Sequence, residues 1–149
     1  DLFEGMLKRV FDPIEALLVE WKIGAEENPV DRLRAMALYF IDRVATDQRM
    51  FRILEISWHK CEYVGEMAAI RDAHLECGNR HMAIIVEAFR LSREREDLPA
   101  TLDPRCAAVG LIVAMDGLVL NWTFNITRFP LKQYGPLIID AYLKGLKDC

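Results

Sequence analysis

Three side chains of types that bind transition metals recur along one predicted helix. His74, Cys77 and His81 follow one another at spacings of three and four residues, which places them on one helix face. Imidazole and thiolate groups at this spacing suit zinc or another transition metal. The same residue types also fill core stripes, and no HExxH, CxxC or paired ExxH motif accompanies them. A metal-responsive sensor is therefore one of several interpretations, and the core stripe is another.

A second cluster could combine a nucleophile with a base. The segment WHKCE, residues 58–62, holds the imidazole of His59 and the thiol of Cys61. These residues are two positions apart, so their side chains diverge on a helix. No Ser-His-Asp set, nucleotide-binding loop or carboxylate pair appears elsewhere in the sequence. We therefore predict neither an enzymatic activity nor a cofactor.

One carboxylate stands inside the most apolar stretch of the chain. Residues 109–122 read VGLIVAMDGLVLNW, and Asp116 is the single charge among them. An unpaired buried carboxylate is costly, so Asp116 needs a partner or water. It could meet His81 or an arginine in the core, form a hydrogen bond across a dimer interface, or line a wet cavity that admits ligands. Composition alone leaves these three explanations open.

Flexible and flat apolar side chains accompany this stretch. Phe40, Phe51 and Trp58 offer surfaces for stacking or for holding a cation. Methionine usually fills cores, although it is also favoured in pockets that accept varied ligands. Taken singly, these residues are typical of a core. The methionines on the predicted apolar faces are Met36, Met50, Met67, Met82 and Met115.

The whole chain has the composition of one globular domain. Its 149 residues are 52% hydrophobic and 28% charged, with 19 Lys and Arg against 23 Asp and Glu. The resulting net charge of −4 argues against this segment binding the phosphate backbone of a nucleic acid by itself. No uncharged apolar run reaches the roughly 18–20 residues of a membrane helix. We therefore expect no membrane contact. The four cysteines lack a close pairing pattern, so we expect free thiols and a cytoplasmic location.

The elements that carry these residues all show the helical period. Pro13 predicts a kink in the first helix, and Asn28-Pro29 and Asp103-Pro104 predict capped helix starts. The predicted helices cover about residues 1–25, 29–46, 48–60, 64–96, 104–124 and 134–147. They predict an all-α six-helix bundle. Because the helix over residues 104–124 is apolar almost all round, we expect the last two helices to form a homodimer interface.

Two segments resemble a known family. LEISWHKCEYVGEM, residues 54–67, resembles the (M/L)EI-x-x-HKCE(F/Y) segment of TetR-family repressors of the AcrR and TtgR type, which control multidrug efflux pumps. LPATLDPRCAAVGLIVAMDGLVLNW, residues 98–122, is similar to the same group's LP-x-x-LD-x-x-x-AA run ending in DG and Trp. The resemblance implies a TetR-type C-terminal ligand-binding and dimerisation domain over residues 1–149. It also implies that the helix-turn-helix DNA-binding domain lies outside this chain, so operator DNA would be bound only through that absent domain.

The resemblance further implies a cavity for hydrophobic or amphipathic effectors, whose binding releases operator DNA and so links the protein to efflux and antibiotic resistance. Asp116 then faces the cavity beside His81, and Pro13 is a candidate hinge. A stand-alone helical dimerisation module that binds a protein or a lipid-like ligand is the alternative. The implied ligand-binding residues are Val10, Leu33, Met36, Ala37, Phe40, Ile53, Leu54, Ser57, Trp58, His81, Ile84, Ile85, Ile112, Met115, Asp116, Val119 and Leu120.

Overall fold

The computed structural model describes residues 27–62, 64–65 and 68–149, together with positions 2, 5, 8, 9 and 12. Within these residues all regular structure is helical, which confirms the all-α class. The predicted helix over residues 1–25, with Val10 and Pro13, lies outside the described part, so the six-helix count stays a prediction. The elements are α2 (Pro29–Thr46), α3 (Gln48–His59), α4 (Ala68–Glu94), α5 (Pro104–Phe124), α6 (Leu131–Gly145) and the short 3-10 helix η2 (Leu146–Asp148).

Local capping sets the starts of α2, α3 and α5. The side chains of Asn28, Asp47 and Asp103 each accept hydrogen bonds from backbone N–H groups in the first turn of the helix that follows. These bonds satisfy donors that have no partner inside the helix. Pro29 and Pro104 occupy the first helical position, where their missing N–H costs nothing. The three predicted starts are confirmed.

Helix α6 begins at Leu131, three residues before its predicted start. Pro130 precedes it without a side-chain capping bond, so no local signal marks the start. Gly135 and Pro136, which disfavour helix interiors, lie within its second turn. Burial compensates, since Leu131 is buried and a Cβ at Gly135 would come within 2.9 Å of Ile41 Cγ2. The tertiary contact with α2 therefore overrides the weak local propensity.

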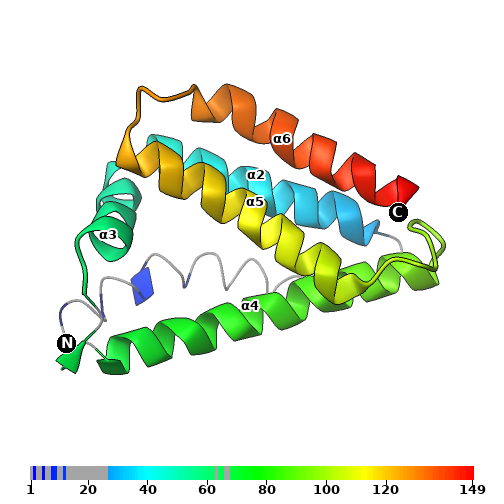
Figure 1. Ribbon diagram of the computed structural model, residues 1–149, viewed down its shortest axis with the longest axis horizontal. Coiled ribbons are helices and arrows are strands. Elements are labelled where there is room, and N and C mark those ends of the chain that lie inside the picture. The colour runs from blue at the N-terminus through cyan, green and yellow to red at the C-terminus, as the bar shows by residue number, and fades with distance from the viewer. Residues whose placement is uncertain are drawn as a thin grey trace.

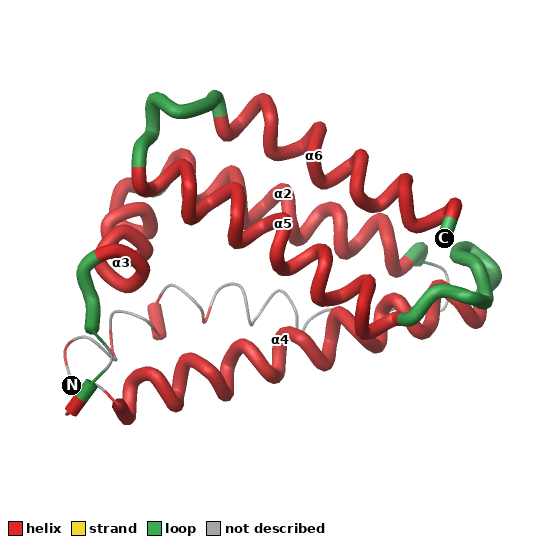
Figure 2. Tube along the Cα trace, in the orientation of Figure 1, coloured by secondary structure: helices red, strands yellow, loops and turns green. Residues whose placement is uncertain are grey.

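The helices form a bundle around α2 and α5. Figure 1 shows α2, α5 and α6 side by side, with α6 antiparallel to α2 and α5, α4 below them and α3 across one end, and Figure 2 traces the same path. α2 and α5 contact each other, and both contact α3, α4 and α6. Arg34 on α2 donates to Asp140 on α6 through Nε and Nη2, at 2.5 and 3.0 Å. Fully buried side chains between the helices include Leu33, Ile41, Leu54, Phe89, Leu111 and Ile139.

Helix α5 is long and apolar enough to cross a membrane by length and composition. It lies instead among α2, α3, α4 and α6, as the core helix of a folded domain does. Its buried residues include Ala108, Leu111 and Val119, whereas Val109 and Val113 are exposed. Apolar residues of α5 therefore both pack in the core and form part of the outer surface.

Gly110 allows α5 and α6 to approach closely, and we expect Gly110→Ala to be strongly destabilising. A Cβ at this position would lie 2.7 Å from Tyr142 Cζ and nearer still to the hydroxyl. That hydroxyl donates to Ala107 O at 2.7 Å, which fixes the ring. The added methyl must displace the ring, so we expect a loss of about 2–3 kcal/mol in the free energy of unfolding, measured by urea denaturation. Gly145→Ala, where a Cβ meets no atom within 4 Å, is the control.

Candidate functional site

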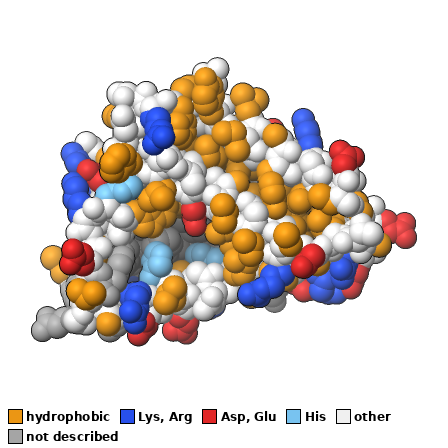
Figure 3. All heavy atoms as spheres, in the orientation of Figure 1, with side chains coloured by type: hydrophobic (Ala, Val, Ile, Leu, Met, Phe, Trp, Pro, Cys, Tyr) orange, Lys and Arg blue, Asp and Glu red, His pale blue; other side chains and the backbone are white. Residues whose placement is uncertain are grey.

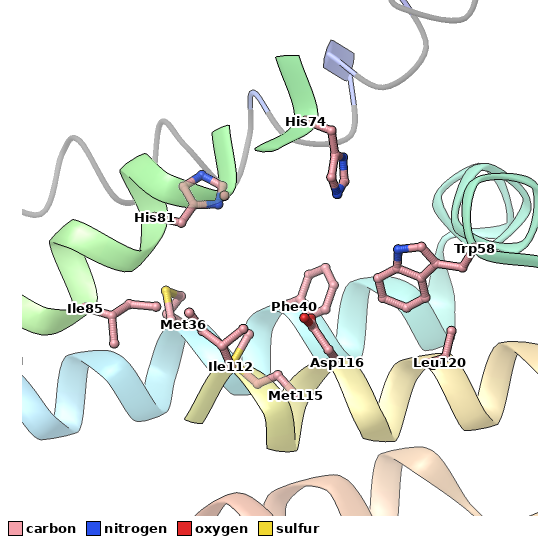
Figure 4. Close-up of a pocket in the computed structure, with 11 residues that line it drawn as sticks. Met36, Phe40, Trp58, His74, His81, Ile85, Ile112, Met115, Asp116 and Leu120 are labelled. Carbon is pink, nitrogen blue, oxygen red and sulfur yellow. The ribbon is translucent and has the colours of Figure 1, made fainter. Parts of the chain in front are cut away.

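A pocket of about 380 Å³ opens between α2, α3, α4 and α5. Figure 4 shows the side chains converging on it, and Figure 3 shows the surface hollowed here, with histidine side chains inside. Its size falls in the range of small-molecule sites. The residues that line it are Met36, Phe40, Trp58, His74, Gly78, His81, Ile85, Ile112, Met115, Asp116 and Leu120.

Helical periodicity builds two of the walls. On α4 the wall residues His74, Gly78, His81 and Ile85 recur at three- and four-residue spacing, so they share one face. On α5 Met115 and Asp116 follow Ile112 by three and four residues, and Leu120 follows Asp116 by four, so these residues also share one face. Apolar side chains, among them two methionines and two aromatic rings, make up most of this surface, and the titratable groups among the described lining residues are one carboxylate and two imidazoles. This combination suits an apolar ligand that carries a polar or cationic group.

Asp116 is the carboxylate of the pocket. Its side chain reaches water through the open cavity, yet the surrounding apolar atoms displace much of its hydration. This desolvation raises the pKa of Asp116 to about 6. In the described part of the chain Asp116 makes no hydrogen bond or ion pair. The carboxylate therefore lies on a cavity wall and not in sealed hydrocarbon.

The two histidines of the pocket lie on α4, opposite Asp116 (Figure 4). Burial lowers the pKa of His74, because desolvation disfavours the imidazolium. His81 Nε2 lies 3.8 Å from Cys77 Sγ, one turn earlier on the same helix. The suggested pairing of His81 with Asp116 is not formed, since desolvation is the cause of the raised pKa of Asp116 and His81 does not contribute to it. Among the described residues, no three His, Cys, Asp or Glu side chains converge as metal ligands would.

The structure divides the residues implied by the resemblance into two groups. Those on the pocket wall are Met36, Phe40, Trp58, His81, Ile85, Ile112, Met115, Asp116 and Leu120. Those buried in the core beside the pocket are Leu33, Ala37, Ile53, Leu54, Ser57 and Val119. Ile84 packs partly buried against the core, and Val10 is outside the described residues. His74 and Gly78 line the pocket without having been placed there from the sequence, although His74 lies on the same stripe as His81.

The HKCE segment ties α3 to the end of α5. His59 Nε2 lies 3.1 Å from Thr123 Oγ1, and the His59 ring meets Phe124 edge-on at 5.3 Å between centroids. Lys60 Nζ donates to Glu55 Oε1 at 3.0 Å. His59 thereby takes part in the packing of α3 against α5. The segment positions Trp58, which is the α3 contribution to the pocket wall.

An apolar outer surface lies on α5, next to the residues that line the pocket, and on α6. We call it the α5/α6 face, and it comprises the exposed residues Val109, Val113, Tyr134, Leu137 and Ile138. Figure 3 shows hydrophobic side chains gathered over α5 and α6. Val113 and Leu137 are each 63% exposed, which is unusual for apolar side chains grouped on packed helices. Such a grouping is typical of a surface that another protein covers.

Comparison with known proteins places this architecture among transcription regulators. Residues 28–148 match the family described as MAATS-type transcriptional repressor, C-terminal region. The HTH-type transcriptional regulator AcrR of Shigella flexneri is 29% identical over 147 residues, covering 96% of this chain and 68% of that protein. The HTH-type transcriptional regulator TtgR of Pseudomonas putida is 34% identical over 126 residues, covering 82% of this chain and 58% of that protein.

Solved structures share the fold. NalD, the secondary repressor of the MexAB-OprM multidrug efflux pump in Pseudomonas aeruginosa, superposes with a TM-score of 0.86 at 22% identity, covering 98% of this chain and 72% of NalD. The SmeT–triclosan complex gives a TM-score of 0.84 at 20% identity, covering 96% of this chain and 68% of SmeT. The helical arrangement of this chain is therefore shared with the solved structures of NalD and SmeT.

Proposed function

Since this chain belongs to the TetR-type family of MAATS-type transcriptional repressor C-terminal regions, we propose that it is the effector-binding and dimerisation domain of a multidrug-type repressor. The observation that carries the proposal is the pocket of about 380 Å³, with apolar walls and one carboxylate. The repressor senses hydrophobic or amphipathic molecules in the cytoplasm, needs no cofactor and controls an efflux pump. Operator DNA is bound by a region outside these 149 residues.

The walls indicate the chemistry of the ligands. Phe40 and Trp58 offer ring surfaces for aromatic ligands, and the methionines adapt to different shapes. Triclosan, the ligand in the SmeT complex, is an apolar aromatic compound and thus a suitable first probe. Asp116 adds affinity for cationic groups, because its ionised form attracts them inside a poorly hydrated site.

Helix α5 supplies a physical connection between ligand and dimer. Ile112 and Met115 of this helix line the pocket, and Val109 and Val113 of the same helix belong to the α5/α6 face. We propose that two copies pair through this surface and that the ligand prefers one spacing of the pair. A coupling of about 1–3 kcal/mol between ligand binding and operator binding is typical of such transitions.

Met115→Trp tests this function, because the larger side chain fills the pocket from α5. Met115 is half-buried on the wall, so the added ring has the cavity to occupy. We expect triclosan to bind the wild-type chain and to raise its melting temperature. We expect the dissociation constant for triclosan, measured by isothermal titration calorimetry, to rise at least tenfold in Met115→Trp. Leu75→Trp, at an exposed position of α4, is the matched control. Equal triclosan affinity in Met115→Trp and wild type would contradict the proposal that this pocket is the effector-binding site.

A further inference from the structure

We propose that Cys77 and His81 form a covalent capture site for apolar aromatic α,β-unsaturated carbonyl compounds that enter the pocket. The inference rests on the proposed function, because the same pocket must first bind the compound. It goes beyond reversible binding by assigning a bond-forming group to the α4 wall. The observation behind it is the distance of 3.8 Å between Cys77 Sγ and His81 Nε2, beside a cavity of about 380 Å³.

The helix places the thiol beside the pocket, although Cys77 itself is not one of the lining residues. Cys77 comes three residues after His74 and four before His81, and both histidines line the pocket. Residues at these spacings share a helix face, so Cys77 lies on the stripe that borders the cavity. Gly78, the next residue, also lines the pocket, and a Cβ built on it would meet no atom within 4 Å. A ligand can therefore approach α4 closely beside the sulfur.

The imidazole supplies what a thiol needs for addition. With Nε2 unprotonated, His81 accepts the thiol proton as Cys77 Sγ attacks the β-carbon of the unsaturated carbonyl. The S–C bond forms as the C=C π bond breaks, and the electron pair moves onto the carbonyl as an enolate. His81 then returns the proton to the α-carbon. The product is a saturated thioether, no electrons are lost, and no further reactant is required.

The other cysteines provide internal controls for this reactivity. Cys106 and Cys149 are exposed, whereas Cys61 and Cys77 are only partly accessible, and none forms a disulfide. Exposure alone therefore predicts that Cys106 and Cys149 react first. The structure predicts the opposite order for an apolar aromatic electrophile, because the pocket holds the compound next to Cys77 and raises its local concentration.

The experiment compares labelling rates of the four thiols in one sample. The full chain is treated at pH 7 with limiting N-phenylmaleimide, and peptide mass spectrometry gives a rate for each cysteine. We expect Cys77 to react about tenfold faster than Cys106 and Cys149, and we expect the saturated analogue N-phenylsuccinimide to suppress labelling of Cys77 alone. Faster labelling of Cys106 or Cys149, or labelling of Cys77 that the analogue does not suppress, would overturn the proposal.

Two variants separate the thiol from its base. We expect Cys77→Ser to abolish the fast labelling reaction. Fast labelling of another cysteine in this variant would contradict the assignment to Cys77. His81→Gln lowers the labelling rate of Cys77 about tenfold at saturating N-phenylmaleimide, where differences in binding no longer matter. An unchanged saturating rate would exclude the imidazole as the base. If triclosan binds while Cys77 shows no preference, only the covalent step fails. If triclosan binding is absent or insensitive to Met115→Trp, the proposed function fails.

Discussion

Leu137→Glu is expected to convert the proposed homodimer into a monomer. Leu137 is 63% exposed on α6, within the apolar α5/α6 face that we propose as the homodimer interface. In a two-fold dimer the same patch meets its copy, so one substitution introduces two carboxylates into the interface. Each must lose water without gaining a partner, which is costly. We expect the dimer dissociation constant, measured by sedimentation equilibrium, to rise at least 100-fold, or ~3 kcal/mol.

Leu75→Glu is the matched control for this effect. Leu75 is also an exposed leucine, at 56%, but it lies on α4 outside the α5/α6 face. We expect Leu75→Glu to remain a dimer with the wild-type dissociation constant. Circular dichroism of Leu137→Glu must show wild-type helix content, so that loss of the dimer is not loss of the fold. A dimer of unchanged strength in folded Leu137→Glu would place the interface elsewhere.

The fold was predictable wherever local hydrogen bonding decides a boundary. Asn28, Asp47 and Asp103 precede their helices with acceptor side chains, and these are chemical features that a sequence displays directly. The start of α6 was not predictable in this way. Leu131 is helical because it is buried in the assembled bundle, whereas Pro130 provides no side-chain cap and Pro136 argues against an early start. Burial in the assembled bundle, unlike a capping side chain, cannot be seen in the residues next to the helix start.

The sequence predicted which helix faces point toward the pocket, but it did not predict which residues on those faces line the pocket. On α2 all four of Leu33, Met36, Ala37 and Phe40 are buried, yet Met36 and Phe40 line the pocket whereas Leu33 and Ala37 do not. The spacing of residues identifies the inward side of a helix, but neighbouring helices decide which inward residues meet a cavity. Gly78 also lines the pocket, but it does so with its backbone. Because glycine has no side chain, its place in the sequence gives no indication of a pocket.

Asp116→Asn is expected to weaken binding of a cationic aromatic ligand about 30-fold at pH 8. N-methylquinolinium keeps its charge at every pH, and 1-methylnaphthalene has nearly the same shape without charge. Because the apolar walls raise the pKa of Asp116 to about 6, the carboxylate is almost fully ionised at pH 8 and mostly protonated at pH 5. A contact between opposite charges in a poorly hydrated site is worth about 2 kcal/mol, which corresponds to the expected factor.

The pH dependence of binding follows from the same pKa. Affinity of the wild-type chain for N-methylquinolinium should rise about tenfold from pH 5 to pH 8 as Asp116 ionises, and affinity for 1-methylnaphthalene should not. His74 and His81 face Asp116 from α4, and their protonation at low pH also opposes a cation. Because burial lowers the pKa of His74, His74→Gln should change the profile only at its acidic end. Fluorescence titrations at each pH measure all of these affinities.

Stability provides an independent readout of the same carboxyl group. A pKa raised in the native state means that the contribution of Asp116 to stability is greatest below pH 4, falls as the pH rises to about 6, and then stays lower. Asp116→Asn removes that loss, so the variant should be more stable than wild type at pH 8 and equal to it below pH 4. Because the side chain is open to water, we expect a gain of only about 1 kcal/mol in urea denaturation. A variant that is stabilised at pH 8 yet binds N-methylquinolinium as tightly as wild type would show that the carboxylate is desolvated but does not contact the ligand.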